Sequence, residues 1–279
     1  MNTNKSRKPR PYWHVDAKWI TGILLIFLLN ITFVVFILVQ ITAPEPGIAL
    51  LTMTLASAYS FESGGLDAPD DIEVMRQKIA ESPNGEWQPI PGMRIVVREE
   101  DIAGKTPREV RLWFFQQWAE PLYYEGEHGL TNLITDPKMQ KGVEGGVGPL
   151  GFISAATHRM LLRVLIAFGL VSFFFLGWLV FFSYRFGRLS SPGCVIFLAA
   201  IPGLILMAGV RGWLGQAQNP SAADELPALA RYTQLAADVL PGIVQTALLI
   251  YVCLIVLGVG LMFIALVGTV FVRERKGTD

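Results

Sequence analysis

Residue types that commonly do chemistry are sparse in this chain of 279 residues, which has three histidines and two cysteines. The Glu-Gly-Glu-His run at 125–128 has the side chains of a metal site. It lacks the i, i+4 spacing of helical ligands and a further His or Cys nearby. The glycine-rich run 142–148 lacks the Lys-Ser/Thr pair of a phosphate-binding loop. No serine lies in a Gly-x-Ser-x-Gly context. We therefore predict no catalytic residue, no cofactor-binding residue and no metal site.

Basic side chains form a second group with potential chemistry. Arg159 and Arg163 are one helical turn apart and follow His158 at one end of an apolar run. This spacing predicts a site for an anionic ligand or a lipid headgroup. The alternative is that the two arginines extend their charged ends to the headgroup layer, or pair with acidic residues of the neighbouring domain.

Aromatic side chains form the third group, on a helix that we predict near residue 115. Trp113 and Phe114 share one face of this helix, and Phe115 lies on the opposite face. A helix that is apolar on both sides is expected to be buried on both sides. It is either the central core helix of a small domain, or it docks one side on headgroups or on a partner protein. The candidate ligand or partner contacts are Trp113, Phe114, Trp118, His158, Arg159 and Arg163.

Four long apolar runs dominate the rest of the sequence. They cover residues 19–41, 164–184, 194–210 and 239–272, and none contains Asp, Glu, Lys, Arg or His. At ~1.5 Å per helical residue, each run crosses or nearly crosses a hydrocarbon layer of ~30 Å. The sequence thus predicts an integral membrane protein. The first run is longer than the roughly 7–15 apolar residues of a signal peptide, so we expect an uncleaved anchor.

Polar side chains inside these runs are few and uncharged. Charged residues within membrane helices usually mark ion paths and proton relays, so their absence disfavours a proton- or sodium-coupled transporter. We expect polar residues such as Asn30, Thr32 and Ser172 to hydrogen-bond between helices.

The charges outside the runs are sorted by sign, although the formal net charge is zero. If both termini and the 185–193 loop face the cytoplasm, that side holds ten basic and three acidic residues, a balance of +7. The remainder holds 13 basic and 20 acidic residues, a balance of −7. Basic flanks are retained on the cytoplasmic side, so we predict that the N-terminus and the C-terminus are both cytoplasmic. Basic residues at membrane flanks and a net acidic domain give no basis for nucleic-acid binding.

These patterns divide the chain into nine segments. The predicted boundaries are 1–18 (basic cytoplasmic tail), 19–41 (first span), 42–158 (extracytoplasmic domain), 159–184 (second span), 185–193 (cytoplasmic hairpin loop), 194–213 (third span), 214–238 (extracytoplasmic loop), 239–272 (fourth span) and 273–279 (cytoplasmic tail). In the 214–238 loop we expect a surface helix over 224–237.

The exported segment is predicted to form a small α+β domain inserted between the first two spans. We predict helices over 69–81 and 106–120, the second opened by a Thr-Pro-Arg-Glu capping box and ended or kinked by Pro121. Residues 86–90 and 93–98 are predicted to pair as a hairpin. The apolar stretch 48–58 is too short to span, so it lies on the membrane surface or in the core. Glycines within 142–151 predict a flexible connector, and Ser154 is expected to cap a helix that continues into the second span.

We predict a non-enzymatic multi-pass protein of a prokaryotic cytoplasmic membrane. Its partners would be the lipid bilayer and a protein partner or a second copy of the chain. Its exported domain would bind a partner or ligand, for sensing, assembly or scaffolding. The alternatives are a transport subunit and an enzyme working at the membrane surface.

The transport alternative depends on topology. A span, an outer domain and then three spans, with both termini inside, is similar to the membrane subunits of MacB- and FtsX-type ABC transporters. The resemblance is one of topology and size. It implies a cytoplasmic ATPase as partner.

Overall fold

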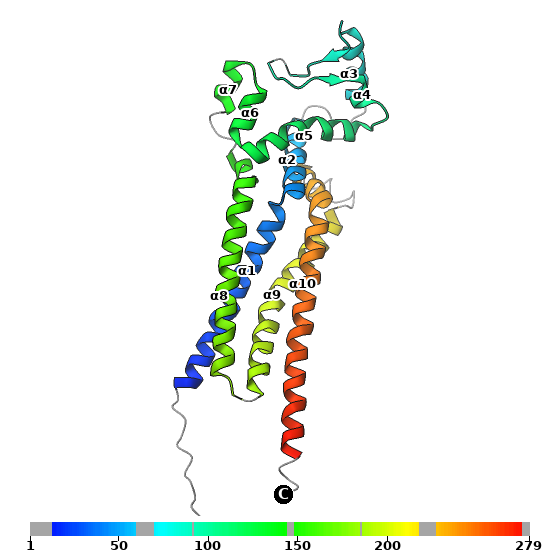
Figure 1. The fold of residues 1–279 in the computed structure, drawn as a ribbon. Helices are drawn as coiled ribbons and strands as arrows, with labels where there is room; N and C mark the ends of the chain where they lie inside the picture. The colour runs from blue at the N-terminus through cyan, green and yellow to red at the C-terminus, as the bar shows by residue number, and fades with distance from the viewer. Residues whose placement is uncertain are drawn as a thin grey trace, which may run out of the picture. The chain divides into compact units, whose positions relative to one another are not determined.

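The computed structural model describes residues 13–59, 70–90, 92–143, 148–184, 186–217 and 227–274 (Figure 1). Two compact units divide the chain. We call Met1–Ile37, Arg163–Gly212 and Val244–Asp279 the membrane unit, and Leu38–Leu162 with Trp213–Ile243 the globular unit. Parts of several predicted segments lie outside the described residues, among them the start of the basic tail, the middle of the glycine-rich connector, most of the residues that link the last two spans, and the end of the C-terminal tail.

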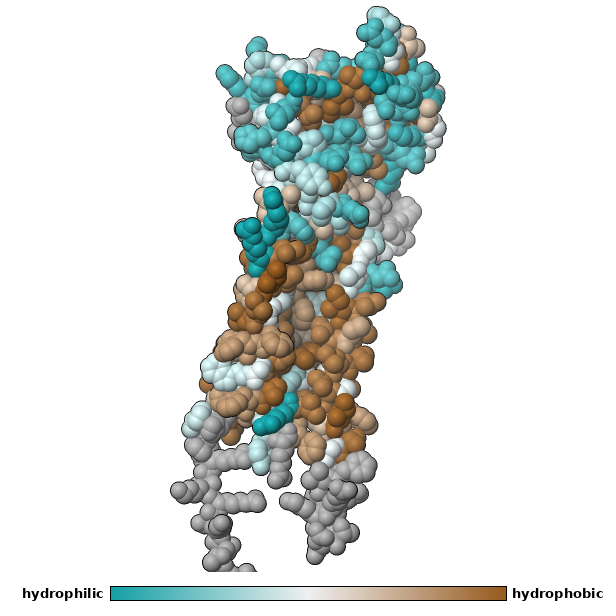
Figure 2. Space-filling model, in the orientation of Figure 1, coloured by the Kyte–Doolittle hydropathy of each residue, from teal (hydrophilic) through white to brown (hydrophobic). Residues whose placement is uncertain are grey.

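Among the described residues, four helices are long and apolar enough to cross a membrane, as expected of the predicted multi-pass membrane protein. They are α1 (Trp13–Ile41), α8 (Ala155–Phe182), α9 (Gly187–Ala217) and α10 (Pro227–Glu274). Many of their large apolar side chains stay exposed, Phe173 and Phe181 the most among them. Figure 2 shows hydrophobic side chains over the visible face of the membrane unit and mostly hydrophilic ones over that of the globular unit. An exposed apolar surface of this kind is suited to lipid as the solvent.

Close helix packing within the membrane unit depends on small residues. A Cβ added at Gly193 of α9 would lie 2.7 Å from the carbonyl oxygen of Gly258 in α10, and one at Gly258 would lie 2.8 Å from that of Gly193. Gly203 likewise lies directly against the ring of Tyr251, which also meets Phe33 of α1 at a centroid distance of 5.3 Å. Small residues let helix backbones approach in this way where no hydrophobic force drives association.

The polar groups in the first span mostly bond within their own helix. Asn30 Nδ2 donates to the Ile26 carbonyl at 2.8 Å, and Thr32 Oγ1 donates to that of Leu28 at 2.8 Å. Thr32 Oγ1 also lies 3.3 Å from Ser172 Oγ of α8. The expectation of bonds between helices is therefore met at the Thr32–Ser172 pair, whereas Asn30 bonds a carbonyl one turn earlier in its own helix.

The last two span helices are longer than the sequence predicts. Helix α9 begins at Gly187, so most of the predicted 185–193 hairpin loop is helical, and Pro192 and Pro202 lie inside the helix. Helix α10 runs for 48 residues, so the surface helix and the fourth span predicted separately are one helix, with Pro241 inside it. Membrane helices tolerate such prolines because neighbouring groups satisfy the freed carbonyls.

The globular unit is mainly helical. Its elements are α2 (Pro44–Tyr59), α3 (Asp70–Glu81), β1 (Glu86–Trp87), β2 (Val97–Arg98), α4 (Glu99–Ile102), α5 (Pro107–Glu125), α6 (Glu127–Leu133), α7 (Pro137–Val143) and the 3₁₀ turn η1 (Gly148–Phe152). The predicted hairpin is present as a two-residue antiparallel pair in which Glu86 faces Arg98, with Arg98 Nη2 2.8 Å from Glu86 Oε1. A sheet of two short strands among the described residues does not clearly show the predicted α+β domain.

Helix α5 runs through the core of the globular unit. Its capping box is confirmed: Thr106 Oγ1 accepts from the Glu109 backbone N–H at 3.3 Å, and Glu109 Oε2 accepts from the Thr106 backbone N–H at 2.7 Å. Both faces are buried, as the pattern predicts. Of the end or kink predicted at Pro121, the end is wrong, because α5 passes through Pro121 and ends at Glu125. Leu122 and Tyr123 beyond the proline are buried, and this packing offsets the one hydrogen bond that proline removes.

Candidate functional site

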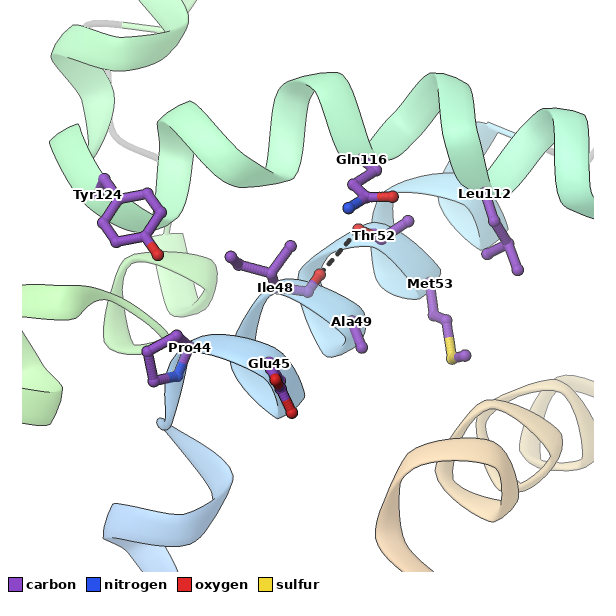
Figure 3. A pocket seen from close by; sticks show the side chains of 9 residues that line it. All are labelled: Pro44, Glu45, Ile48, Ala49, Thr52, Met53, Leu112, Gln116 and Tyr124. Carbon is purple, nitrogen blue, oxygen red and sulfur yellow. Dashed lines mark hydrogen bonds between the residues drawn. The ribbon is translucent and has the colours of Figure 1, made fainter. Parts of the chain in front are cut away.

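A groove lies between α2 and α5 of the globular unit (Figure 3). Its volume is about 430 Å³, and it is lined by Pro44, Glu45, Ile48, Ala49, Thr52, Met53, Leu112, Gln116 and Tyr124. Helix α2 supplies one wall through residues spaced three and four apart, which lie on one helical face. Helix α5 supplies the other wall.

The interruption of the helix between α1 and α2 sets the position of α2. Helix α1 ends at Ile41, and α2 begins at Pro44, whose fixed φ suits the first helical position. Gly47 then meets α5 directly, since a Cβ there would lie 2.9 Å from Cε2 of Tyr123 and 3.3 Å from Cγ2 of Ile153. Absence of a side chain at Gly47 thus allows the close approach of α2 to α5 that forms the groove.

The groove is apolar along its length with polar groups at a few points. Pro44, Ile48 and Met53 present carbon and sulfur surfaces. Thr52 is buried, and its Oγ1 donates to the Ile48 carbonyl at 2.8 Å, so its hydroxyl proton is already used. Glu45, Gln116 and Tyr124 supply a carboxylate, an amide and a phenol (Figure 3). This arrangement suits an apolar ligand with one polar end.

A buried hydrogen-bonded joint adjoins the groove. The Tyr123 hydroxyl donates to the Thr42 carbonyl at 2.7 Å, and Thr42 Oγ1 lies 3.4 Å from His158 Nδ1. Thr42 and Tyr123 are both buried, and burial raises the pKa of the Tyr123 phenol above its ordinary value. The joint links α5 to the residue that follows α1 and to the first turn of α8.

The joint and the groove share a pair of neighbouring rings. Tyr124 lines the groove, and its ring meets that of Tyr123 edge to face, with centroids 5.0 Å apart and an interplanar angle of 88°. A ligand that contacts Tyr124 is therefore one side chain from the Tyr123–Thr42 hydrogen bond.

The three predicted aromatic contacts lie mainly in the core. Phe114 and Trp118 are buried, and their ring centroids are 5.9 Å apart. Trp113 is half-buried, with Lys105 Nζ 4.9 Å from its ring centroid. Phe114 and Trp118 thus contribute to the stability of α5, and a partner reaches them only after the core opens.

The three predicted polar contacts all lie near the start of α8. His158 belongs to the joint described above. Arg159 is exposed, and its Nε donates to the Ala155 carbonyl at 3.2 Å. Arg163 is also exposed, and it belongs to the membrane unit. None of the six predicted contact residues is among the residues that line the groove.

Only a partial signal for the groove residues is present in the sequence. Pro44 and Glu45 belong to the segment predicted to stop the first span, and Ile48 begins the short apolar stretch expected on the membrane surface or in the core. The structure buries Leu51 and Ala56 of this stretch in the core of the globular unit. Which of its other residues face α5 depends on the helix crossing, for which the sequence has no local pattern.

Potential metal ligands do not cluster in the part of the chain that the structure describes. No group of three or more His, Cys, Asp or Glu side chains lies close enough there to hold an ion. His128 is exposed at the start of α6.

Comparison with protein-family models, curated proteins and solved structures finds no match for this chain. The site is therefore interpreted from its own chemistry.

Proposed function

We propose that this chain is a non-enzymatic multi-pass protein of a prokaryotic cytoplasmic membrane, with both termini in the cytoplasm. Its globular unit, exported between the first and second spans, binds a ligand or partner in the groove between α2 and α5. Binding there alters the joint at Thr42, and the protein thereby acts in sensing or assembly. The charge balance of +7 inside against −7 outside supports this orientation.

The observation that carries the proposal is the Tyr123–Thr42–His158 joint. It connects the helix that forms one wall of the groove to the residue that follows α1 and to the first turn of α8. Both of those helices are candidate membrane spans. A conformational switch requires a ligand that binds two arrangements of one element with different affinity, and we propose that the joint is that element.

Two neighbouring glutamines permit a matched test in intact cells. Gln116 and Gln117 are both exposed on α5, and of the two Gln116 lines the groove. Cysteine is placed at either position in a chain whose Cys194 and Cys253 are replaced by serine, and a membrane-impermeant maleimide is added to the cells. We expect Gln117→Cys to react rapidly and Gln116→Cys to react several-fold more slowly, because the ligand covers it. After purification that strips the ligand, the two rates should converge.

Two results would count against this function. If neither cysteine reacts until the cells are opened, the globular unit is not exported. If both react equally fast in cells and after purification, the groove is empty. The joint is tested by amide exchange at residues 38–43, where release of the ligand should raise the exchange rate in the parent chain and have little effect in Tyr123→Phe.

A further inference from the structure

We propose that the groove binds a phospholipid of the surrounding membrane whose headgroup carries a primary amine. This inference rests on the proposed function, since it names the ligand class of the same groove. It follows from three properties of the groove: its apolar lining, its distance from the end of a membrane span, and the charge at its α2 end.

The lining matches an acyl chain. The groove has a volume of about 430 Å³, and the apolar part of its lining comes from Pro44, Ile48, Ala49, Met53 and Leu112. A ligand that covers apolar surface in the groove gains binding free energy of ~25 cal/mol for each Å² that it removes from water. Methionine adapts to a flexible chain because its side chain is unbranched and polarizable.

The chain itself holds one end of the groove at the membrane surface. Pro44 is three residues beyond Ile41, the last residue of the first candidate span. Three residues reach at most about 11 Å. The headgroup layer on each side of the bilayer is about 5–8 Å thick. Pro44 and Glu45 are therefore in or next to the headgroups, where lipid is the most concentrated apolar ligand.

The charge at this end selects the headgroup. Glu45 is the charged side chain among the described residues that line the groove, and it is exposed in the first turn of α2. A primary ammonium can donate charge-assisted hydrogen bonds to this carboxylate. A quaternary ammonium has no N–H to donate, and an anionic headgroup is repelled. Gln116 and Tyr124 offer further polar contacts to a phosphate or ester oxygen (Figure 3).

A protein partner fits the groove less well. Stable protein interfaces use about 20–30 residues a side, and a helix with its side chains is about 10–12 Å across. The described part of this groove is lined by nine residues. One acyl chain with its headgroup is a better match to that size.

The test uses the full chain in lipid nanodiscs of two compositions. One contains phosphatidylethanolamine with phosphatidylglycerol, and the other replaces the ethanolamine lipid with phosphatidylcholine. Native mass spectrometry after release counts retained lipids. We expect one ethanolamine lipid to be retained by the parent chain, with about tenfold preference over the choline lipid, the size expected of a charge-assisted hydrogen bond.

Two substitutions in the groove address the chain and the headgroup separately. Ala49→Trp fills the groove and should abolish lipid retention, whereas Gln117→Trp on the exposed side of α5 should leave lipid retention unchanged. Glu45→Gln should remove the preference for the amine but keep the lipid, and Glu120→Gln, which removes a charge from α5 outside the groove, should keep the preference. Because Glu45 is exposed, its variant is expected to fold even if the tryptophan variant does not.

The outcomes separate the lipid from the wider proposal. If no lipid is retained, or if Glu45→Gln has no effect on headgroup preference, the amine lipid is the wrong ligand. If the Gln116→Cys variant stays protected in cells while the released chain carries a protein or another small molecule, the proposed function stands and the lipid inference fails. If lipid retention and protection of the Gln116→Cys variant are both absent, both proposals fail.

Discussion

Phe114 of the globular unit and Phe173 of the membrane unit both lie in long helices, but Phe114 is 6% exposed and Phe173 is 75% exposed. Most of the buried apolar residues that the structure describes in the globular unit form one core cluster around α5. The membrane unit has two smaller clusters, one around Leu25, Leu179 and Val195, and one around Ala200 and Tyr251. The difference reflects the solvent, since water penalises exposed apolar surface and lipid does not.

The two units also differ in what brings helices together. In the globular unit, large aromatic side chains fill the space around α5, and Thr106 and Gly126 cap its ends. In the membrane unit, α9 and α10 approach through Gly193 and Gly258, where backbone meets backbone. Burial therefore holds α5 in place, whereas close backbone contact holds α9 against α10.

The largest expected effect comes from the same substitution made in both units. Phe114→Ala should destabilise the globular unit by about 3–5 kcal/mol, because it leaves a cavity in the core. Phe173→Ala should change stability by less than about 0.5 kcal/mol, because lipid fills the vacated space. Amide exchange of α5 and α8 in the full chain in nanodiscs measures both. Equal losses would mean that Phe173 is covered by protein rather than lipid.

A smaller effect is expected from two glycines on α10. Gly258→Val should weaken the α9–α10 crossing by about 1–3 kcal/mol, because its Cβ meets the Gly193 carbonyl oxygen. Gly260→Val is the matched control, since a Cβ there meets nothing within 4 Å and the change in helix propensity is the same. Resistance of the full chain to proteolysis in rising SDS compares the two. A loss in the Gly260 variant as large as that in the Gly258 variant would contradict the backbone crossing.

The sequence predicts the elements whose cause is local. Runs without charge indicate the four spans, and the Thr-Pro-Arg-Glu pattern indicates the start of α5. The predicted helix end at Pro121 is wrong because a proline rule is local, whereas burial of Leu122 and Tyr123 is not. The sequence separates the surface helix over 224–237 from the fourth span where the apolar run begins, whereas the described part of both is one helix, α10. The predicted hairpin loop over 185–193 is mostly helical, because α9 begins at Gly187 and continues through Pro192.

The candidate site is less predictable than the fold. The groove depends on contact between Gly47 and Tyr123, which are far apart in sequence, and neither residue type marks a site by itself. The aromatic residues near residue 115 indicate a helix that is buried, and Phe114 and Trp118 lie in the core of the globular unit rather than at a binding surface. Sequence pattern thus identifies α5, and the α2–α5 crossing selects Gln116 and Tyr124 as the residues available to a ligand.

The smallest effect is expected at the N-terminal cap of α5 in the globular unit, where the Thr106 side chain accepts a backbone hydrogen bond. Thr106→Ala should cost about 0.5–2 kcal/mol, because the Glu109 backbone N–H loses its acceptor. Thr106→Ser keeps the hydroxyl and should restore most of the loss. The difference is measured by thermal unfolding of the full chain, with amide exchange in the first turn of α5 as the readout. A serine variant as unstable as the alanine variant would assign the effect to the lost methyl group instead of the cap.

The same cap predicts a pH dependence with a definite sign. Hydrogen bonds from the Thr106 backbone N–H and hydroxyl to the Glu109 carboxylate lower the pKa of Glu109 in the folded chain. A lowered folded pKa means that this stabilisation is present above the unfolded value of about 4.3 and is lost as pH falls through the folded value. Glu109→Gln should therefore flatten the fall in α5 stability below about pH 4.3. Glu120→Gln, which removes the same charge from the same helix away from the cap, should leave that part of the profile unchanged, and an equal flattening in both variants would locate the acid sensitivity outside the cap.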